Sequence, residues 1–256
     1  MRKRSRIALT LLLLAVIGGI GWVVTRPSEP VYEGKRLSEW LESNTSGNGD
    51  SKAYAAVVAA GTNAIPTLLR FMRSTDSPLK MKLLALAQKQ HFIKFHHVGA
   101  KDRIFQSYSG FMALGDKGIV ALPELIKIYE QNDPYAQFSI ARLFGYFGPA
   151  ASNAVPCLVR RLEVADAIPL ETAIPALGRI HARPKLAVPA LLKHINKKTP
   201  MLDPAVYAIG QFGADAKEAV PVLVGLPGDQ DDIIRRIAAN SLRQIDPEAA
   251  AKAGVK

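Results

Sequence analysis

Apolar residues recur at helical spacing along most of the chain, and one ten-residue stretch shows the pattern clearly. In residues 153–162 the apolar positions Val155, Leu158, Val159 and Leu162 are spaced i, i+3, i+4 and i+7, which predicts one buried stripe of a helix. Pro156 stands at its start, where a missing N–H costs nothing. The stretch therefore predicts a short amphipathic helix that begins near Pro156.

The same stretch recurs at nearly constant intervals. Prolines with similar apolar neighbours precede Pro156 by 33 residues and follow it after 33 and then 32 more. With one further copy upstream, the series is Pro66, Pro123, Pro156, Pro189 and Pro221. A second series has steps of 33, 32 and 33 residues: Phe147, Ile180, Phe212 and Ile245. Its first two steps equal those from Pro156 to Pro189 and on to Pro221. Two registers that agree predict a repeat of two helices, and such pairs must stack because one pair cannot bury its apolar faces alone.

Three glycines, Gly145, Gly178 and Gly210, keep the same register in the first helix of each pair. Since glycine lacks a side chain, we expect these positions to allow close approach between neighbouring helices. We expect the repeat domain to cover residues 51–256. The interval from Pro66 to Pro123 is 57 residues, or 33 plus 24, which predicts an inserted helix near residues 78–95.

The N-terminal region has a different character. Residues 1–6 are basic, and the 18 residues 7–24 carry no charge. As a helix they span about 27 Å at roughly 1.5 Å per residue, enough to cross a hydrocarbon core. We predict a transmembrane signal anchor at 7–24, with residues 1–6 in the cytoplasm and the repeat domain outside it. Cleavage of the segment as a signal peptide, which would release a secreted protein, is the alternative.

Residues 25–50 are predicted to form a linker and an N-terminal cap for the repeats. Pro27 and Pro30 indicate an extended linker. Ser38 is predicted to cap a short helix that buries Leu37, Trp40 and Leu41. Terminal units of a repeat array must cover an open apolar face.

Residues 148–158, Gly-Pro-Ala-Ala-Ser-Asn-Ala-Val-Pro-Cys-Leu, resemble the short HEAT-like repeats first described in phycobilisome lyases, and residues 213–223 are similar to them. The anchor followed by residues 32–41 resembles exported HEAT-repeat proteins of environmental bacteria. The resemblance covers about residues 51–256. It implies an all-α fold, an α-solenoid of about five to six helix pairs, in a protein tethered to the bacterial inner membrane. It also implies protein–protein interaction, with an accessory or lyase-like role on a partner protein as an alternative.

The charge balance favours anionic partners. The formal net charge is +11, and removing the four basic residues of the tail leaves +7 on the rest. Acidic proteins, lipid head groups and nucleic acids all fit such a charge. A segment that exports the repeat domain would keep it away from DNA in the cytoplasm. We therefore expect the partner to be an acidic protein rather than a nucleic acid.

The sequence contains no catalytic motif that we recognise, so we expect no enzyme activity, no cofactor, no small-molecule substrate and no metal site. The histidine cluster His91, His96 and His97 is predicted to be a polar helix end. The acidic group Asp229, Asp231 and Asp232 precedes a predicted helix, where capping explains it. The single cysteine, Cys157, is predicted to be a small buried residue.

A series of cations is the candidate binding site. Four residues after each of the first four repeat prolines stands a basic residue, and two more extend the series; the six are Arg70, Lys127, Arg160, Lys193, Arg161 and Lys197. In HEAT-like arrays the second helices line the concave face, so the resemblance implies a ladder of cations there. We predict a groove that binds an acidic partner. The alternative is that these cations serve the helices themselves, because positive charges near a helix C-terminus interact favourably with the helix dipole.

Overall fold

The computed structural model describes residues 29–43, 51–78, 81–82, 98–131, 133–164, 167–195, 201–226 and 231–255. The expected anchor at 7–24 lies outside these residues. So do the histidine cluster and most of the expected inserted helix, of which only Pro78, Met81 and Lys82 are described, all three helical.

In the described residues the fold is all-α apart from a small hairpin at the N-terminal end. Strands β1 (Val31–Tyr32) and β2 (Lys35–Arg36) pair antiparallel and lead directly into α2 (Leu37–Ser43). The predicted short helix is present, and the burial predicted for Leu37, Trp40 and Leu41 is confirmed. The predicted capping is wrong: Ser38 lies inside the first turn of α2, and its backbone N–H and hydroxyl both donate to Glu29.

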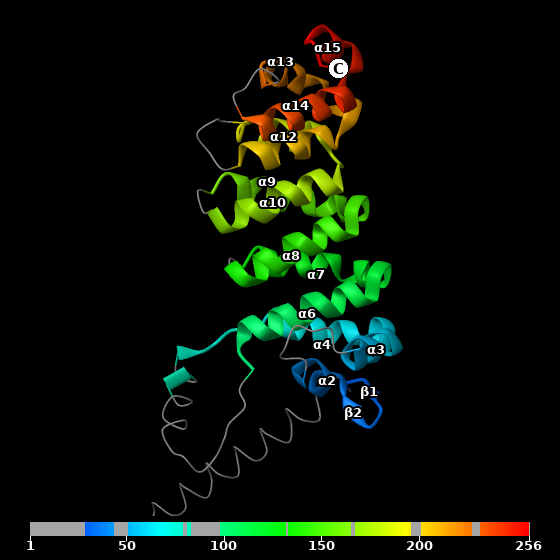
Figure 1. Cartoon of the computed structure of the whole chain (residues 1–256). Helices are drawn as coiled ribbons and strands as arrows, with labels where there is room; N and C mark the ends of the chain where they lie inside the picture. The colour runs from blue at the N-terminus through cyan, green and yellow to red at the C-terminus, as the bar shows by residue number, and fades with distance from the viewer. Residues whose placement is uncertain are drawn as a thin grey trace, which may run out of the picture.

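Six helix pairs follow within the described residues, each with a first and a second helix (Figure 1). The first helices are α3 (Ser51–Ala60), α6 (Ala100–Leu114), α8 (Pro134–Phe147), α10 (Ala167–Ile180), α12 (Leu202–Gly210) and α14 (Asp232–Ile245). The second helices are α4 (Ile65–Met72), α7 (Leu122–Tyr129), α9 (Val155–Leu162), α11 (Pro184–Leu192), α13 (Val220–Leu223) and α15 (Pro247–Lys252). Four pairs carry a 3-10 turn between their helices: η1 (Gly61–Ala64), η2 (Gly115–Ala121), η3 (Gly148–Ala154) and η4 (Gly213–Ala219).

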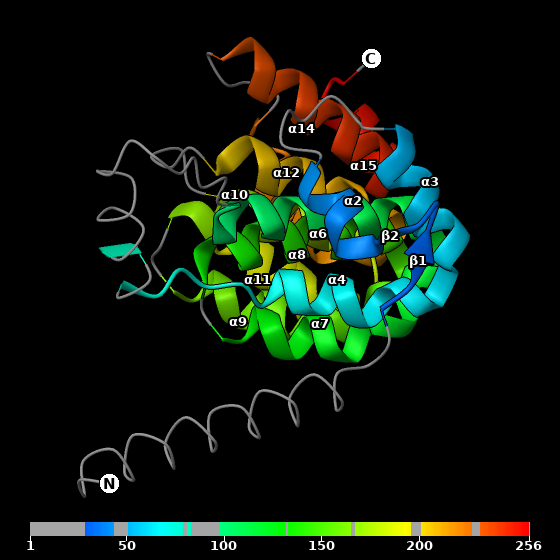
Figure 2. The ribbon, with the colours of Figure 1, turned by 90° about the horizontal axis from the view of Figure 1, so that it is seen from below.

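The pairs are stacked along one direction, in sequence order. Each first helix contacts the next one along the chain, from α3 through α6, α8, α10 and α12 to α14. Figure 2, which looks along the stack, shows α4, α7 and α9 together on one side of α6, α8 and α10. The arrangement therefore gives the molecule a first-helix side and a second-helix side.

The proline register places equivalent residues in the core. The residue two positions after each repeat proline is fully buried in every copy, with 0% of its surface exposed: Leu68, Leu125, Leu158, Leu191 and Leu223. The residue two positions before each proline is always a buried alanine: Ala64, Ala121, Ala154, Ala187 and Ala219. The first helices keep their own register, with Phe144, Leu177, Ile209 and Leu242 all at 0% exposure. The two series thus form one continuous core along the stack.

The fourth pair departs from the expected start of the second helix. Pro66, Pro123, Pro156 and Pro221 are each the second residue of their helix, as predicted. Pro189 instead lies inside α11, which begins earlier, at Pro184. The fourth pair replaces the 3-10 turn with three residues, so the helix that contains Pro189 extends further toward its N-terminus.

Glycines set the turn between the two helices of a pair. Gly61, Gly115, Gly148 and Gly213 all have φ between 53° and 56°. At Gly148 φ is 55° and ψ is −137°, a backbone region that residues with a Cβ atom avoid. These four turn glycines were not identified as a repeating series from the sequence. His181 occupies the same place in the fourth pair and also has a positive φ, of 33°.

Among the described residues, one stretch, Lys52–Met72, is long and apolar enough to cross a membrane by length and composition alone. It comprises α3, η1 and α4, and 44% of its most apolar window is buried inside the protein. Helix α3 contacts α2, β1 and α6, and helix α4 contacts α6 and α7. Packing within the stack therefore accounts for its apolar character.

The aligned glycines of the first helices mark close contacts between successive first helices. A Cβ atom added at Gly145 would lie 3.3 Å from the Cα atom of Ala176, and one added at Gly178 would lie 2.8 Å from the Cα atom of Ala208. At Gly210 the added atom would meet the side chain of Ser241 at 2.5 Å. The predicted close approach is therefore present at three successive interfaces, and the partner in each is a small residue.

We predict that Gly178→Ala lowers the free energy of unfolding by about 1–3 kcal/mol, because the new methyl group overlaps the backbone of Ala208. Gly225→Ala is the matched control, since nothing lies within 4 Å of an added Cβ atom there. That change should be neutral or stabilise by up to about 1 kcal/mol. Urea unfolding of both variants checks the prediction, and equal stabilities would contradict it.

Candidate functional site

The predicted cations lie on the second-helix side where the structure describes them. Arg70 is on α4, Lys127 is on α7, and Arg160 and Arg161 are in the last turn of α9. Lys193 directly follows the last residue of α11. Lys197 lies outside the described residues. The five described cations thus lie on, or directly after, four successive second helices.

Three of these cations have carboxylate partners that the sequence interpretation missed. Arg70 pairs with Glu29 at 3.4 Å, Lys127 pairs with Glu124 at 2.6 Å, and Arg160 pairs with Glu130. Glu29 and Glu130 come from other elements, so their pairing depends on the tertiary fold. Only Glu124, three residues before Lys127 on the same helix, gave a signal in the sequence.

Glu124 is shared by two cations. Its second carboxylate oxygen lies 2.6 Å from the guanidinium of Arg73, which follows α4 in the neighbouring pair. The hydrogen bond from Lys127 and the charges of Lys127 and Arg73 hold the pKa of Glu124 below its usual value. One carboxylate between two cations leaves this part of the surface positive.

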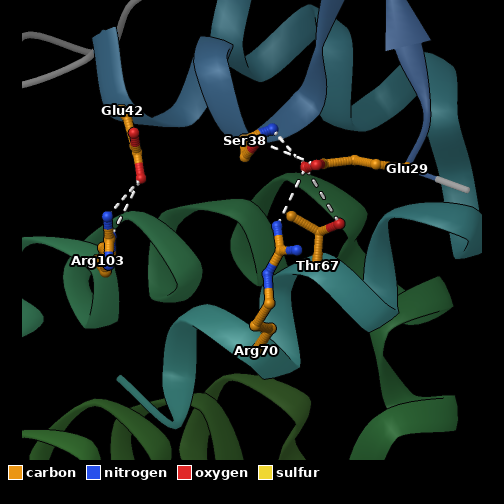
Figure 3. A network of polar contacts seen from close by, with 6 residues as sticks. All are labelled: Glu29, Ser38, Glu42, Thr67, Arg70 and Arg103. Atoms are coloured by element: carbon orange, nitrogen blue, oxygen red, sulfur yellow. Dashed lines mark hydrogen bonds and ion pairs between the residues drawn. The ribbon is translucent and has the colours of Figure 1, made fainter. Parts of the chain in front are cut away.

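Arg70 belongs to a polar network that fastens the N-terminal segment to the first two pairs (Figure 3). Glu29 accepts hydrogen bonds from the Ser38 backbone N–H at 2.6 Å and from Thr67 at 3.4 Å. Arg103 of α6 donates to Glu42 of α2 at 2.9 Å. A pocket of about 280 Å³ lies among these side chains. Because its charged groups pair with one another, this network serves to hold α2 on the stack.

A second pocket, of about 250 Å³, lies where α7, α8 and α9 meet. We call it the α7–α9 pocket; its lining residues are Tyr129, Glu130, Gln137, Cys157, Arg160, Arg161 and Val164. It includes two of the predicted cations, which the fold brings beside the end of α7. Gln137 donates from its side-chain amide to the Tyr129 carbonyl at 2.9 Å and so joins α8 to α7.

The wall of the α7–α9 pocket contains a buried hydroxyl and a buried thiol. Only 2% of Tyr129 and 4% of Cys157 is exposed. Burial, together with the charge of Cys157, raises the pKa of Tyr129, while the charge of Arg161 lowers it. Burial, with the nearby charge of Glu130, raises the pKa of Cys157 to about 12. Both groups are therefore neutral at physiological pH, and Cys157 is the buried residue that the sequence predicts.

The first-helix side carries a different surface. Phe105, Tyr135 and Phe138 are exposed on α6 and α8. Arg142 lies over the rings of Tyr108, at 5.0 Å, and of Phe138, at 5.5 Å. The charge of Arg142 is thus already engaged with aromatic rings, and the second-helix side remains the better candidate for binding an anion.

The described part of the chain brings no three His, Cys, Asp or Glu side chains together as a metal site. The acidic group before α14 acts at least in part as predicted, since Asp231 accepts a hydrogen bond from the Ile233 N–H at 2.8 Å.

No protein-family model matches the chain, and no curated protein matches it.

The buried thiol predicts a pH dependence of stability. Well below pH 9, the ordinary pKa of a thiol, the Cys157 side chain is protonated in both the folded and the unfolded chain. As pH rises further, the unfolded chain loses this proton while the folded chain keeps it, because the folded pKa is about 12. The thiol should therefore lower the free energy of unfolding by about 1.4 kcal/mol between about pH 8 and about pH 10.

Urea unfolding of the unaltered chain and of Cys157→Ala at both pH values measures this effect. Alanine is a suitable replacement because Ala190 stands at the matching position one repeat later. The fall in stability should be smaller in the variant by the stated amount. An equal fall in both proteins would contradict the prediction.

Proposed function

We propose that this protein is a non-catalytic interaction scaffold built as a HEAT-like α-solenoid. The stacked helix pairs with their two registers support this proposal. In the same proposal, residues 7–24 tether the chain to the bacterial inner membrane and place the repeat domain outside the cytoplasm. The apolar run and its basic flank in the sequence support that arrangement.

We propose further that the second-helix side binds an acidic protein partner. The observation that carries this proposal is the sharing of one carboxylate, Glu124, between Lys127 and Arg73. Lys193 adds a cation that makes no ion pair with any described residue. Internal pairing therefore does not cancel the positive charge on this side.

The exposure of these cations suits a partner that arrives from solution. The side chains of Lys127 and Arg160 are 66% and 62% exposed. Exposed charges of this kind add little affinity individually and act mainly on association rate and partner choice. We therefore expect a binding surface that uses several cations together and weakens as salt is added.

Charge reversal tests the proposal. In the full-length chain, kept in neutral detergent, Arg160→Glu with Lys193→Glu should weaken binding of a poly-L-glutamate peptide about tenfold. The control is Lys101→Glu with Lys217→Glu, which changes the net charge equally at exposed sites on α6 and η4. Titration calorimetry at two salt concentrations measures both.

A second control keeps the ion pair between Arg160 of α9 and Glu130, which directly follows α7. Exchanging the partners, with Arg160→Glu and Glu130→Arg, preserves the pair and the net charge and should retain binding. Equal losses in the two charge-reversed proteins would mean that only net charge matters and would contradict the proposal. Tighter binding of a single-stranded oligonucleotide than of the peptide would favour a nucleic-acid-binding function instead, through the exposed aromatic residues of α6 and α8.

A further inference from the structure

We propose that the polar pocket between α2, α4 and α6 binds the phosphate of an anionic lipid head group. We call it the α2–α6 pocket; its charged lining residues are Glu29, Arg36, Glu42, Arg70 and Arg103. The inference rests on the membrane anchor of the proposed function and adds a second contact between the repeat domain and the membrane. With a volume of about 280 Å³, the pocket holds a phosphate group with several water molecules, each of about 30 Å³.

The charges of the α2–α6 pocket do not cancel. Glu29 pairs with Arg70 at 3.4 Å, and these two residues come from different elements. Glu42 pairs with Arg103 at 2.9 Å. Arg36 makes no ion pair with any described residue. Three arginines and two glutamates sum to one positive charge, which equals in size the single negative charge of a phosphodiester. The unbalanced charge of the pocket therefore belongs to Arg36.

The two paired arginines also keep hydrogen-bond donors for a ligand. A guanidinium has five N–H donors in a planar fork that suits phosphate. In its ion pair Arg70 uses one nitrogen and Arg103 uses two. Both guanidiniums lie 5.7 Å from the buried ring of Phe71, which holds them beside the pocket. The hydroxyl of Ser74, another lining residue, makes no hydrogen bond with a described residue and adds one more donor.

The proposed anchor brings this pocket close to the lipid head groups. Glu29 follows the end of the anchor, residue 24, by five residues, which span at most about 18 Å. The side chain of Glu29 is only 12% exposed and accepts a hydrogen bond from the Ser38 N–H at 2.6 Å. The Pro30 carbonyl accepts one from the Leu37 N–H at 2.9 Å. The chain is therefore fixed to the stack within about 18 Å of the hydrocarbon core, beside a head-group layer roughly 5–8 Å thick. The α2 end of the stack faces the membrane, and the α15 end lies far from it (Figure 1).

The hairpin places an apolar side chain beside Arg36. Val31 of β1 is the cross-strand partner of Arg36, and such partners project from the same face of a sheet. Val31 is 66% exposed. The next residue, Tyr32, instead packs against Trp40, with 6.4 Å between the ring centroids. The outer face of the hairpin thus combines a cation with an exposed apolar group, a combination typical of segments that lie in the membrane interface.

Arg36→Gln tests the inference, and Lys35→Gln is the matched control. Lys35 is the neighbouring residue of β2, but its ammonium lies 4.7 Å from the ring of Trp40 and it does not line the pocket. The two variants therefore lose the same charge at nearly the same place. Each full-length protein is reconstituted in nanodiscs of phosphatidylcholine, either alone or mixed equally with phosphatidylglycerol.

Hydrogen exchange of the α2 amides, followed by mass spectrometry, measures binding. In the unaltered chain phosphatidylglycerol should slow the exchange of Leu37 and Ser38 about tenfold, because a bound head group stabilises the closed pocket. Arg36→Gln should lose this slowing, and Lys35→Gln should keep it. Each protein is compared with its own exchange in phosphatidylcholine alone, so an effect of the substitution on stability does not enter the result.

The outcomes separate this inference from the proposed function. No slowing in the unaltered chain, or equal slowing in Arg36→Gln, would overturn the pocket and leave the anchored scaffold standing. Equal losses in both variants would show attraction by overall charge and would also overturn it. Inorganic phosphate, added to phosphatidylcholine nanodiscs, tests the source of the phosphate, and a slowing as large as that by phosphatidylglycerol would overturn the assignment to a lipid. A chain that does not stay in the nanodiscs would overturn the anchor and this inference together.

Discussion

Close contact between successive first helices is the constraint on which the rest of this structure depends. At three interfaces in a row, a glycine of one helix lies against a small residue of the next: Gly145 on Ala176, Gly178 on Ala208 and Gly210 on Ser241. Short separation lets the large apolar residues on either side interdigitate, and dense packing of this kind stabilises each pair through its neighbours. The second helices then follow the spacing of the first, which places their cations on one side of the stack.

Much of this fold could be predicted from the sequence, because a repeat displays the same residue in several equivalent environments. The leucine two positions after each proline was visible as a pattern, and it is fully buried in all five copies. The first-helix register and the tight glycines were visible in the same way. Features that occur once were harder to predict. The hairpin before α2 and the early start of α11 at Pro184 depend on local turns that no other copy contains.

The candidate site shows the same division between repeated and unique features. The cations could be found because they recur four residues after the prolines. Their partners could not, because Glu29 and Glu130 reach Arg70 and Arg160 only through the tertiary fold. Tyr129 stands at a position that is apolar in the copies with Met72 and Leu162, and its buried hydroxyl without a described hydrogen-bond partner becomes apparent only when α7, α8 and α9 are placed together. In a repeat protein, specific chemistry is thus best sought where one copy differs from the others.

Hydrogen exchange followed by mass spectrometry on the full-length chain tests most directly whether the pairs stabilise one another. If contact between first helices carries the stability, the amides of α8, α10 and α12 should share the slowest exchange, with one common opening free energy, while α2 and α15 at the ends exchange faster. Independent opening free energies for α8, α10 and α12, or exchange of α10 as fast as that of the terminal helices, would contradict this account.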